Sequence, residues 1–298
     1  MRLISILSIL ILAACVEIKA QKPILISEDS ILFGKSRNPG ISVYIPEGNF
    51  KKTLKAWKKG MESGTRSNLM TERGEMSIFG AIIKDIDPNP LNIYSKLIDL
   101  DTVVKLSVIF EVNKDKYIEK STGETELSKA KIYLKEFARL CYVDVAQEQA
   151  NAEEKKLHKI ERDLSSLERQ KTRYQKSIQK NESRIIDENG NIEVQNNELT
   201  RLSAEIVDQY KQLSSTVTSD AQKEKKDYIK ELNRTKRKTL NSIRSSKNRI
   251  DKAHNEINKA NLEIPKNERM QTQVMEKITK QEAVYQQFAD KVNTIKAY

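Results

Sequence analysis

The 298-residue chain has few of the residues that a compact catalytic domain usually needs. Aromatic residues make up only 6% of it, and it contains 9 glycines and 6 prolines. A globular domain of this length would have more turns and a larger aromatic core, whereas long helices need neither. Charged residues, in contrast, make up 32% of the chain. This composition predicts that much of the protein is long, charged helix.

Cysteine and histidine are scarcer still, at 2 residues each. Neither His158 nor His254 has a cysteine or histidine neighbour at ligand spacing, so we predict no zinc site and place both on solvated helix surface. Cys141 lies at helical spacing from Leu134 and Ala138, which predicts a buried small residue, with a disulfide between two chains as the alternative. No glycine-rich phosphate loop is present. The sequence therefore predicts no catalytic residues, no cofactor and no enzyme.

The first twenty residues have the pattern of a secretory signal peptide. Arg2 supplies a positive charge, and the mostly apolar stretch 3–14 is too short to span a membrane. We predict cleavage after Ala20, a small residue that suits signal peptidase. The alternative is a lipidated N-terminus at Cys15, because Leu-Ala-Ala-Cys at 12–15 fits a bacterial lipobox. Both predict an exported protein of the periplasm or outer membrane, and lipidation would add a lipid anchor.

Residues 21–145 have the pattern of a small α+β domain. After an irregular lead-in at 22–40, short β-branched stretches predict strands at 41–45, 76–86, 92–100 and 104–112. Apolar residues three and four apart predict helices at 50–61 and from residue 125 onward. Such an order favours a small antiparallel sheet with two helices on one face.

Residues 146–298 predict a long all-α region of coiled coil or helical hairpin. Apolar residues alternate at spacings of three and four, as a coiled-coil seam requires. We predict turns near 188–191, where Asn-Gly occurs, near 214–220, and near 264–266, where Pro265 would break the helix. A seam needs a partner helix, either in the same chain, in a second copy or in another helical protein. The predicted seam residues are Leu157, Ile160, Leu164, Leu167, Tyr174, Ile178, Ile185, Leu199, Leu202, Ile206 and Leu213.

One segment has a partial calcium-binding pattern. Asp187, Asn189, Asn191 and Glu198 occupy the first, third, fifth and twelfth positions of a calcium loop. The sixth position should be glycine and is instead Ile192, a β-branched residue that resists a sharp turn. We therefore favour a simple turn here over a metal site.

Positive charge exceeds negative charge, mostly in the second half of the chain, where residues 151–298 carry 31 Lys and Arg against 23 Asp and Glu. A basic stretch around Trp57 could contact an anionic envelope polymer or membrane surface, with the indole inserted. We favour the other interpretation, in which Trp57 packs on the sheet and the lysines face water. The run from Arg234 to Lys252 is also basic, but it lacks aromatics for stacking bases, so no nucleic-acid partner is expected. The candidate contact residues around Trp57 are Lys51, Lys52, Lys55, Lys58 and Lys59.

The layout resembles a group of uncharacterised exported bacterial proteins that have a small N-terminal α+β domain and a C-terminal coiled coil. The resemblance lies in Trp57 within its basic helix and in the segment from Asn92 to Glu111. It implies no known activity. The sequence thus predicts a non-enzymatic envelope scaffold or spacer that self-associates or pairs through coiled-coil helices. An anion-binding module that uses its basic helices is the alternative.

Overall fold

The computed structural model describes residues 22–63, 65–121 and 123–298. The predicted signal peptide, its cleavage after Ala20 and the lipidation of Cys15 lie outside these residues. The chain divides into two compact units. The first, called the domain below, contains the chain through Lys155 together with Ala283–Tyr298, and the second, called the hairpin, contains Lys156–Glu282.

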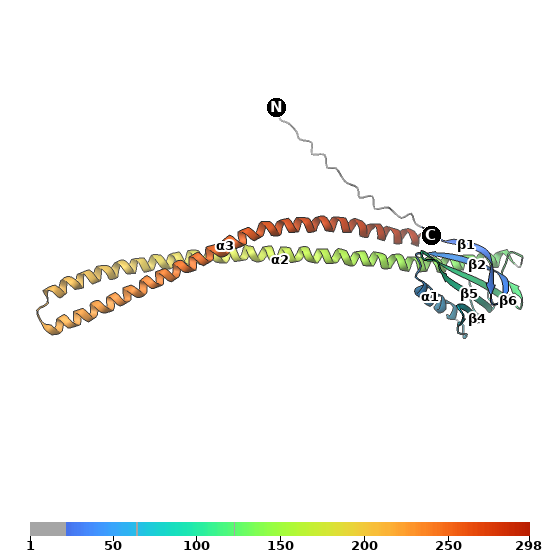
Figure 1. The fold of residues 1–298 in the computed structure, drawn as a ribbon, viewed down its shortest axis with the longest axis horizontal. Helices are drawn as coiled ribbons and strands as arrows, with labels where there is room; N and C mark the ends of the chain where they lie inside the picture. The colour runs from blue at the N-terminus through green and yellow to red at the C-terminus, as the bar shows by residue number, and fades with distance from the viewer. Residues whose placement is uncertain (1–21, 64, 122) are drawn as a thin grey trace, which may run out of the picture. The chain divides into compact units, whose positions relative to one another are not determined.

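Among the described residues, seven strands of the domain form one sheet. All pairs are antiparallel, in the order β1-β2-β6-β5-β4-β3, and β7 pairs with β6 (Figure 1). Two helices accompany this sheet, so the domain has the predicted α+β class. The elements are β1 Leu25–Phe33, β2 Ser36–Pro46, α1 Phe50–Glu62, β3 Met70–Glu72, β4 Glu75–Ala81, β5 Leu91–Asp99, β6 Val103–Asn113, β7 Lys116–Tyr117 and the first part of α2, which begins at Glu124.

The core lies between one face of the sheet and helices α1 and α2. Alternate residues of β5 point to this face, and Ser95 there accepts a hydrogen bond from the Trp57 indole nitrogen at 2.9 Å. Trp57 is fully buried and packs edge-on against Phe137 of α2, with ring centroids 5.0 Å apart. Asn49 caps α1 by accepting a hydrogen bond from the Lys52 backbone N–H at 3.1 Å. The apolar side of α1 is thereby fixed on the sheet.

The prediction of an irregular lead-in at 22–40 is wrong, because these residues form β1 and the first half of β2. The turn between these strands reaches across the second face of the sheet. The Gly34 backbone N–H donates to the Glu75 carboxylate on β4 at 3.0 Å, and Phe33 packs on Tyr94 of β5. Gly40 permits this close approach, since an added Cβ would lie 2.6 Å from the Val108 carbonyl oxygen.

Two helices account for the rest of the chain. Helix α2 spans Glu124–Ser215 and α3 spans Ser219–Lys296, so the chain reverses at 216–218, within the range 214–220 predicted for a turn. Within the hairpin they run antiparallel, side by side (Figure 1). No helix among the described residues combines the length and apolarity needed to cross a membrane.

The turns predicted near 188–191 and 264–266 are wrong, because both segments are helical. Ile185, Glu188 and Ile192 continue the spacing of three and four and are all at least half-buried, while Gly190 is exposed. Pro265 also lies on the exposed side, between seam positions 264 and 267. An interior proline costs about 3 kcal/mol, and burial of the seam on both sides of it offsets that cost.

The predicted boundary between the domain and the helical region, at 145/146, also differs from the structure. Tyr142, Ala146 and Ala150 of α2 form an apolar cluster with Val292 and Ile295 near the end of α3. In addition, the Lys291 ammonium donates to the Glu47 carboxylate at 2.7 Å. The last residues of the chain therefore belong to the domain.

Candidate functional site

The hairpin seam is the most extensive surface that the sequence predicted. The structure places all eleven predicted residues at buried or half-buried positions. Leu157, Leu202 and Ile206 are buried, and Leu202 and Ile206 pack against Leu232 of α3. The half-buried members are Ile160, Leu164, Leu167, Tyr174, Ile178, Ile185, Leu199 and Leu213.

Polar residues interrupt the seam and fix how the two helices align. The Arg249 guanidinium donates to both carboxylate oxygens of Glu188, with Nη2 at 2.8 Å from Oε2, and also to the Ser246 hydroxyl. Hydrogen bonds from Arg249 and Ser246 lower the pKa of Glu188 to about 2. Gln195 also donates to Ser242 at 2.8 Å. A shift in register would separate these partners, so they specify one antiparallel alignment.

The calcium-loop candidate is not a loop. Asp187, Asn189, Asn191 and Glu198 all lie within continuous α2. Helical residues two positions apart point about 200° apart, so Asn189 faces away from Asp187 and Asn191. Glu198 instead accepts hydrogen bonds from Arg201 at 2.8 Å. The described part of the chain contains no group of three His, Cys, Asp or Glu residues placed to hold a metal ion.

The basic helix α1 does not offer its tryptophan to a surface. Trp57 is fully buried, which confirms the prediction that it packs on the sheet and contradicts the alternative in which its indole inserts into an anionic surface. Lys52 forms an ion pair with Glu148 of α2, and Lys58 pairs with Glu62 within α1. The remaining lysines of this group, Lys51, Lys55 and Lys59, are exposed.

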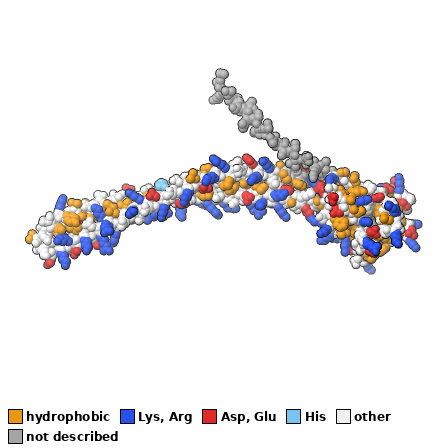
Figure 2. All heavy atoms as spheres, in the orientation of Figure 1, with side chains coloured by type: hydrophobic (Ala, Val, Ile, Leu, Met, Phe, Trp, Pro, Cys, Tyr) orange, Lys and Arg blue, Asp and Glu red, His pale blue; other side chains and the backbone are white. Residues whose placement is uncertain are grey.

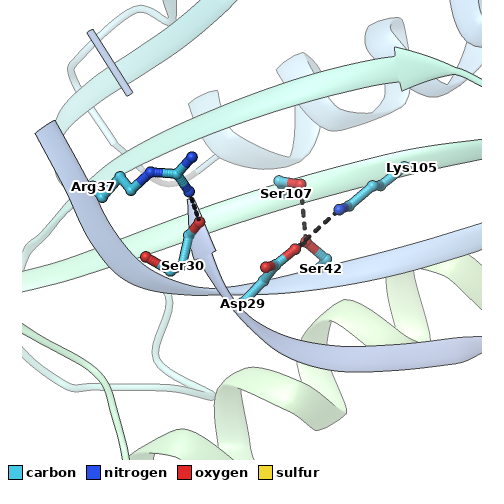
Figure 3. A network of polar contacts seen from close by, with 6 residues as sticks. All are labelled: Asp29, Ser30, Arg37, Ser42, Lys105 and Ser107. Atoms are coloured by element: carbon cyan, nitrogen blue, oxygen red, sulfur yellow. Dashed lines mark hydrogen bonds and ion pairs between the residues drawn. The ribbon is translucent and has the colours of Figure 1, made fainter. Parts of the chain in front are cut away.

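A polar network lies on the second face of the sheet, across the neighbouring strands β1, β2 and β6 (Figure 3). The Lys105 ammonium donates to the Asp29 carboxylate at 3.0 Å, which lowers the pKa of Asp29. The Ser42 hydroxyl lies between Asp29, at 3.1 Å, and the Ser107 hydroxyl, at 2.9 Å. Ser42 is fully buried, and both histidines of the chain lie in the hairpin. These contacts hold β1, β2 and β6 together, and Ser42 has no histidine beside it to act as its base.

Cys141 borders a small pocket of about 230 Å³ between α1 and α2. The thiol is buried, as predicted, and burial with the nearby Asp144 carboxylate raises its pKa to about 12. A thiol is nucleophilic only when deprotonated, so this one is inert near neutral pH. The pocket is also below the ~300 Å³ at which ligand pockets usually begin. It is best described as an imperfection in helix packing.

A larger groove of about 700 Å³ lies on the hairpin near its turn. Its lining includes five cationic side chains and no carboxylate. The sequence showed the basic run, but not that residues 226–241 of α3 meet Tyr210 of α2 along one groove. The signal that could have indicated it is the complete lack of Asp and Glu between Glu231 and Asp251. The cations are Lys226, Lys230, Arg234, Arg237 and Lys238.

Comparison with known proteins identifies no relative by sequence, since no family model and no curated protein matches the chain. A solved structure that does match is a crystal structure described as the Smc head domain with a coiled coil and joint derived from Pyrococcus yayanosii. The match has 16% sequence identity and a TM-score of 0.31, and it covers 75% of this chain and 53% of that chain. This chain thus spans about half the length of that one. A likeness of this degree assigns neither a family nor an activity.

Proposed function

We propose that this chain is a non-enzymatic, exported envelope protein in which the hairpin serves as a spacer. The observation that supports it most is the seam, whose spacing of buried and half-buried positions continues through both helices and is covered within one chain. The hairpin part of α2, residues 156–215, extends ~90 Å at 1.5 Å per residue. A rod of this kind holds the 216–218 turn at a fixed distance from its other end.

The intramolecular seam changes how partners would bind. Because α3 already covers the apolar stripe of α2, a second copy or another helical protein would contact the exposed sides of the hairpin or the domain. Self-association through an open seam would require α2 and α3 to separate first, which exposes Leu202 and Ile206 to water until a second copy covers them.

A matched pair of substitutions tests the spacer. Leu202 is buried in the seam and Val194 of the same helix is 69% exposed. We expect Leu202→Asp to open the hairpin and lower helicity, whereas Val194→Asp leaves it intact. Circular dichroism with light scattering should show a monomer whose melting temperature does not depend on protein concentration. Melting that shifts with concentration would mean that the seam forms between chains and would overturn the proposal.

Export rests on the sequence of residues 1–20 and is tested separately. The intact mass of the protein recovered from a bacterial envelope fraction should correspond to a chain that begins at Gln21. A mass that includes a diacylglyceryl group would instead indicate Cys15 as the N-terminus, and Cys15→Ser would then abolish processing. An unprocessed chain that stays in the cytoplasm would contradict export but leave the spacer proposal standing.

A further inference from the structure

The two sides of the hairpin differ in charge near the turn. On α3, buried and half-buried seam positions recur at spacings of three and four, at Gln222, Lys225, Ile229, Leu232, Lys236, Thr239, Ile243 and Ser246. The residues that directly follow these positions all lie on one side of the hairpin, which we call the basic flank. They include six cations, all exposed, and two uncharged residues, Asn233 and Leu240. Across residues 223–247 this stripe extends ~36 Å. The six cations are Lys223, Lys226, Lys230, Arg237, Arg244 and Lys247.

Helix α2 contributes an uncharged border to the basic flank. Its corresponding residues near the turn, which also directly follow seam positions, are Thr200, Ser203, Val207, Tyr210 and Ser214. The acids of this stretch instead directly precede seam positions, which places them on the opposite side of the hairpin. They are Glu198, Glu205 and Asp208. The next carboxylate on the flank side of α2 is Glu193, farther from the turn.

The central cations of the flank have no ion-pair partner among the described residues. Lys226, Lys230 and Arg237 line the groove and form no salt bridge there, whereas Arg234 beside them pairs with Glu231 at 3.8 Å. Asp227, beside Lys226 in sequence, lies two positions past the seam, on the outer surface. The positive charge is therefore available to an external anion.

Apolar side chains lie among these cations. Val207 is 55% exposed, Tyr210 54% and Leu240 46%. Figure 2 shows hydrophobic side chains (orange) next to Lys and Arg (blue) near the turn of the hairpin. A soluble polyanion gains little from exposed valine and leucine. A bilayer interface binds both the cations and the apolar side chains, because its anionic headgroups attract the cations and the boundary of its acyl chains accepts the apolar side chains.

We propose that the basic flank docks on the surface of an anionic lipid bilayer, with the hairpin lying along the headgroups. Each Lys or Arg near such a surface strengthens partitioning about fivefold. The proposal is independent of catalysis and of export. It is also separate from the spacer role, because a folded hairpin that does not bind lipid would refute only the docking proposal.

Co-sedimentation of the chain from Gln21 to Tyr298 with vesicles tests the docking. We expect binding to vesicles that contain phosphatidylglycerol and much weaker binding to phosphatidylcholine alone. The triple variant Lys226→Gln, Lys230→Gln, Arg237→Gln should lower the partition coefficient about a hundredfold. The control is a second triple variant, Lys159→Gln, Arg173→Gln, Lys180→Gln, which makes the same change in net charge at exposed positions of α2 that form no salt bridge among the described residues. This control should bind almost as well as the parent protein.

A second pair of variants tests the apolar contribution. Val207→Ser with Tyr210→Ser should remove most of the binding that persists at high salt. The control, Val194→Ser with Tyr228→Ser, changes the same residue types at exposed positions outside the basic flank, and it should retain the binding that persists at high salt. Unchanged helicity by circular dichroism shows that all variants remain folded.

Three results would overturn the proposal. Equal losses in the two triple variants would mean that net charge alone drives binding. Equal binding to neutral and anionic vesicles would remove the role of the cations. Binding of soluble polyphosphate without binding of phosphatidylglycerol vesicles would assign the groove to a polymer instead of a bilayer.

Discussion

Replacing Gly190 by alanine has opposite effects in a helix and in a turn. Gly190 lies on the exposed side of α2, and a Cβ added there meets no atom within 4 Å. In a helix interior, alanine is favoured over glycine by about 1 kcal/mol. Because no contact is lost, the free energy of unfolding should rise by that amount. In an Asn-Gly turn, glycine at positive φ would make the same substitution destabilising.

Urea and thermal unfolding, followed by far-ultraviolet circular dichroism, show whether Gly190→Ala raises or lowers the stability of the protein. We expect the melting temperature of Gly190→Ala to rise by about 3 °C. Asn197→Ala, an exposed change on the same helix, should give a smaller gain, and Gly74→Ala, at φ +84°, should destabilise the domain. A loss of stability in Gly190→Ala would refute a continuous α2 and restore the turn at 188–191.

Three further predictions concern the two units. The pKa of Glu188 is lowered to about 2, so its ion pair with Arg249 should stabilise the hairpin fully above about pH 4.5 and progressively less down to pH 2. Thermal unfolding of Glu188→Gln across this range should show a weaker dependence of the melting temperature on pH. The same pH dependence in the variant and the parent would contradict this role of Glu188. Gly40→Ala should destabilise the domain by about 1–3 kcal/mol in urea unfolding, because its Cβ would press on the Val108 carbonyl, and a neutral effect would contradict the close approach. Ile295→Ala should lower the free energy of unfolding by about 2–5 kcal/mol in the same assay, because Ile295 is part of the domain core. A loss as small as that of an exposed residue would show that the end of α3 does not pack in that core.

The elements that the sequence predicts well are those whose burial follows a local period. Val104, Leu106 and Val108 alternate with polar residues, and β6 forms where they indicate. Strand β1 was missed for a physical reason. Its most buried residue, Ile31, is covered only because the β1–β2 turn folds across the second face of the sheet beside Gly40. That arrangement is tertiary and has no period of its own.

In the hairpin seam, the turn predicted at 188–191 is wrong because the local turn propensity of Asn-Gly was given more weight than the heptad spacing of the apolar residues. Asn189-Gly190 is a strong turn signal by itself, yet Ile185 and Ile192 lie one heptad apart with Glu188 between them. Glu188 is polar at a seam position, and its partner, Arg249, lies 61 residues further along the chain, where the local sequence does not reveal it. The basic groove was missed for the same reason, since it appears only once the antiparallel register of the two helices is known.

The cluster that joins the start of α2 to the end of α3 has a consequence for biosynthesis. Tyr142, Ala146 and Ala150 leave the ribosome long before Val292 and Ile295, which cover them. The nascent chain therefore carries an open apolar strip until Val292 and Ile295 have been synthesised. Zippering that starts at residues 216–218 brings the two segments together through successive short closures, each of which has a small entropic cost. A chain that stops before Val292 would keep that strip uncovered and become a target for chaperones and proteases.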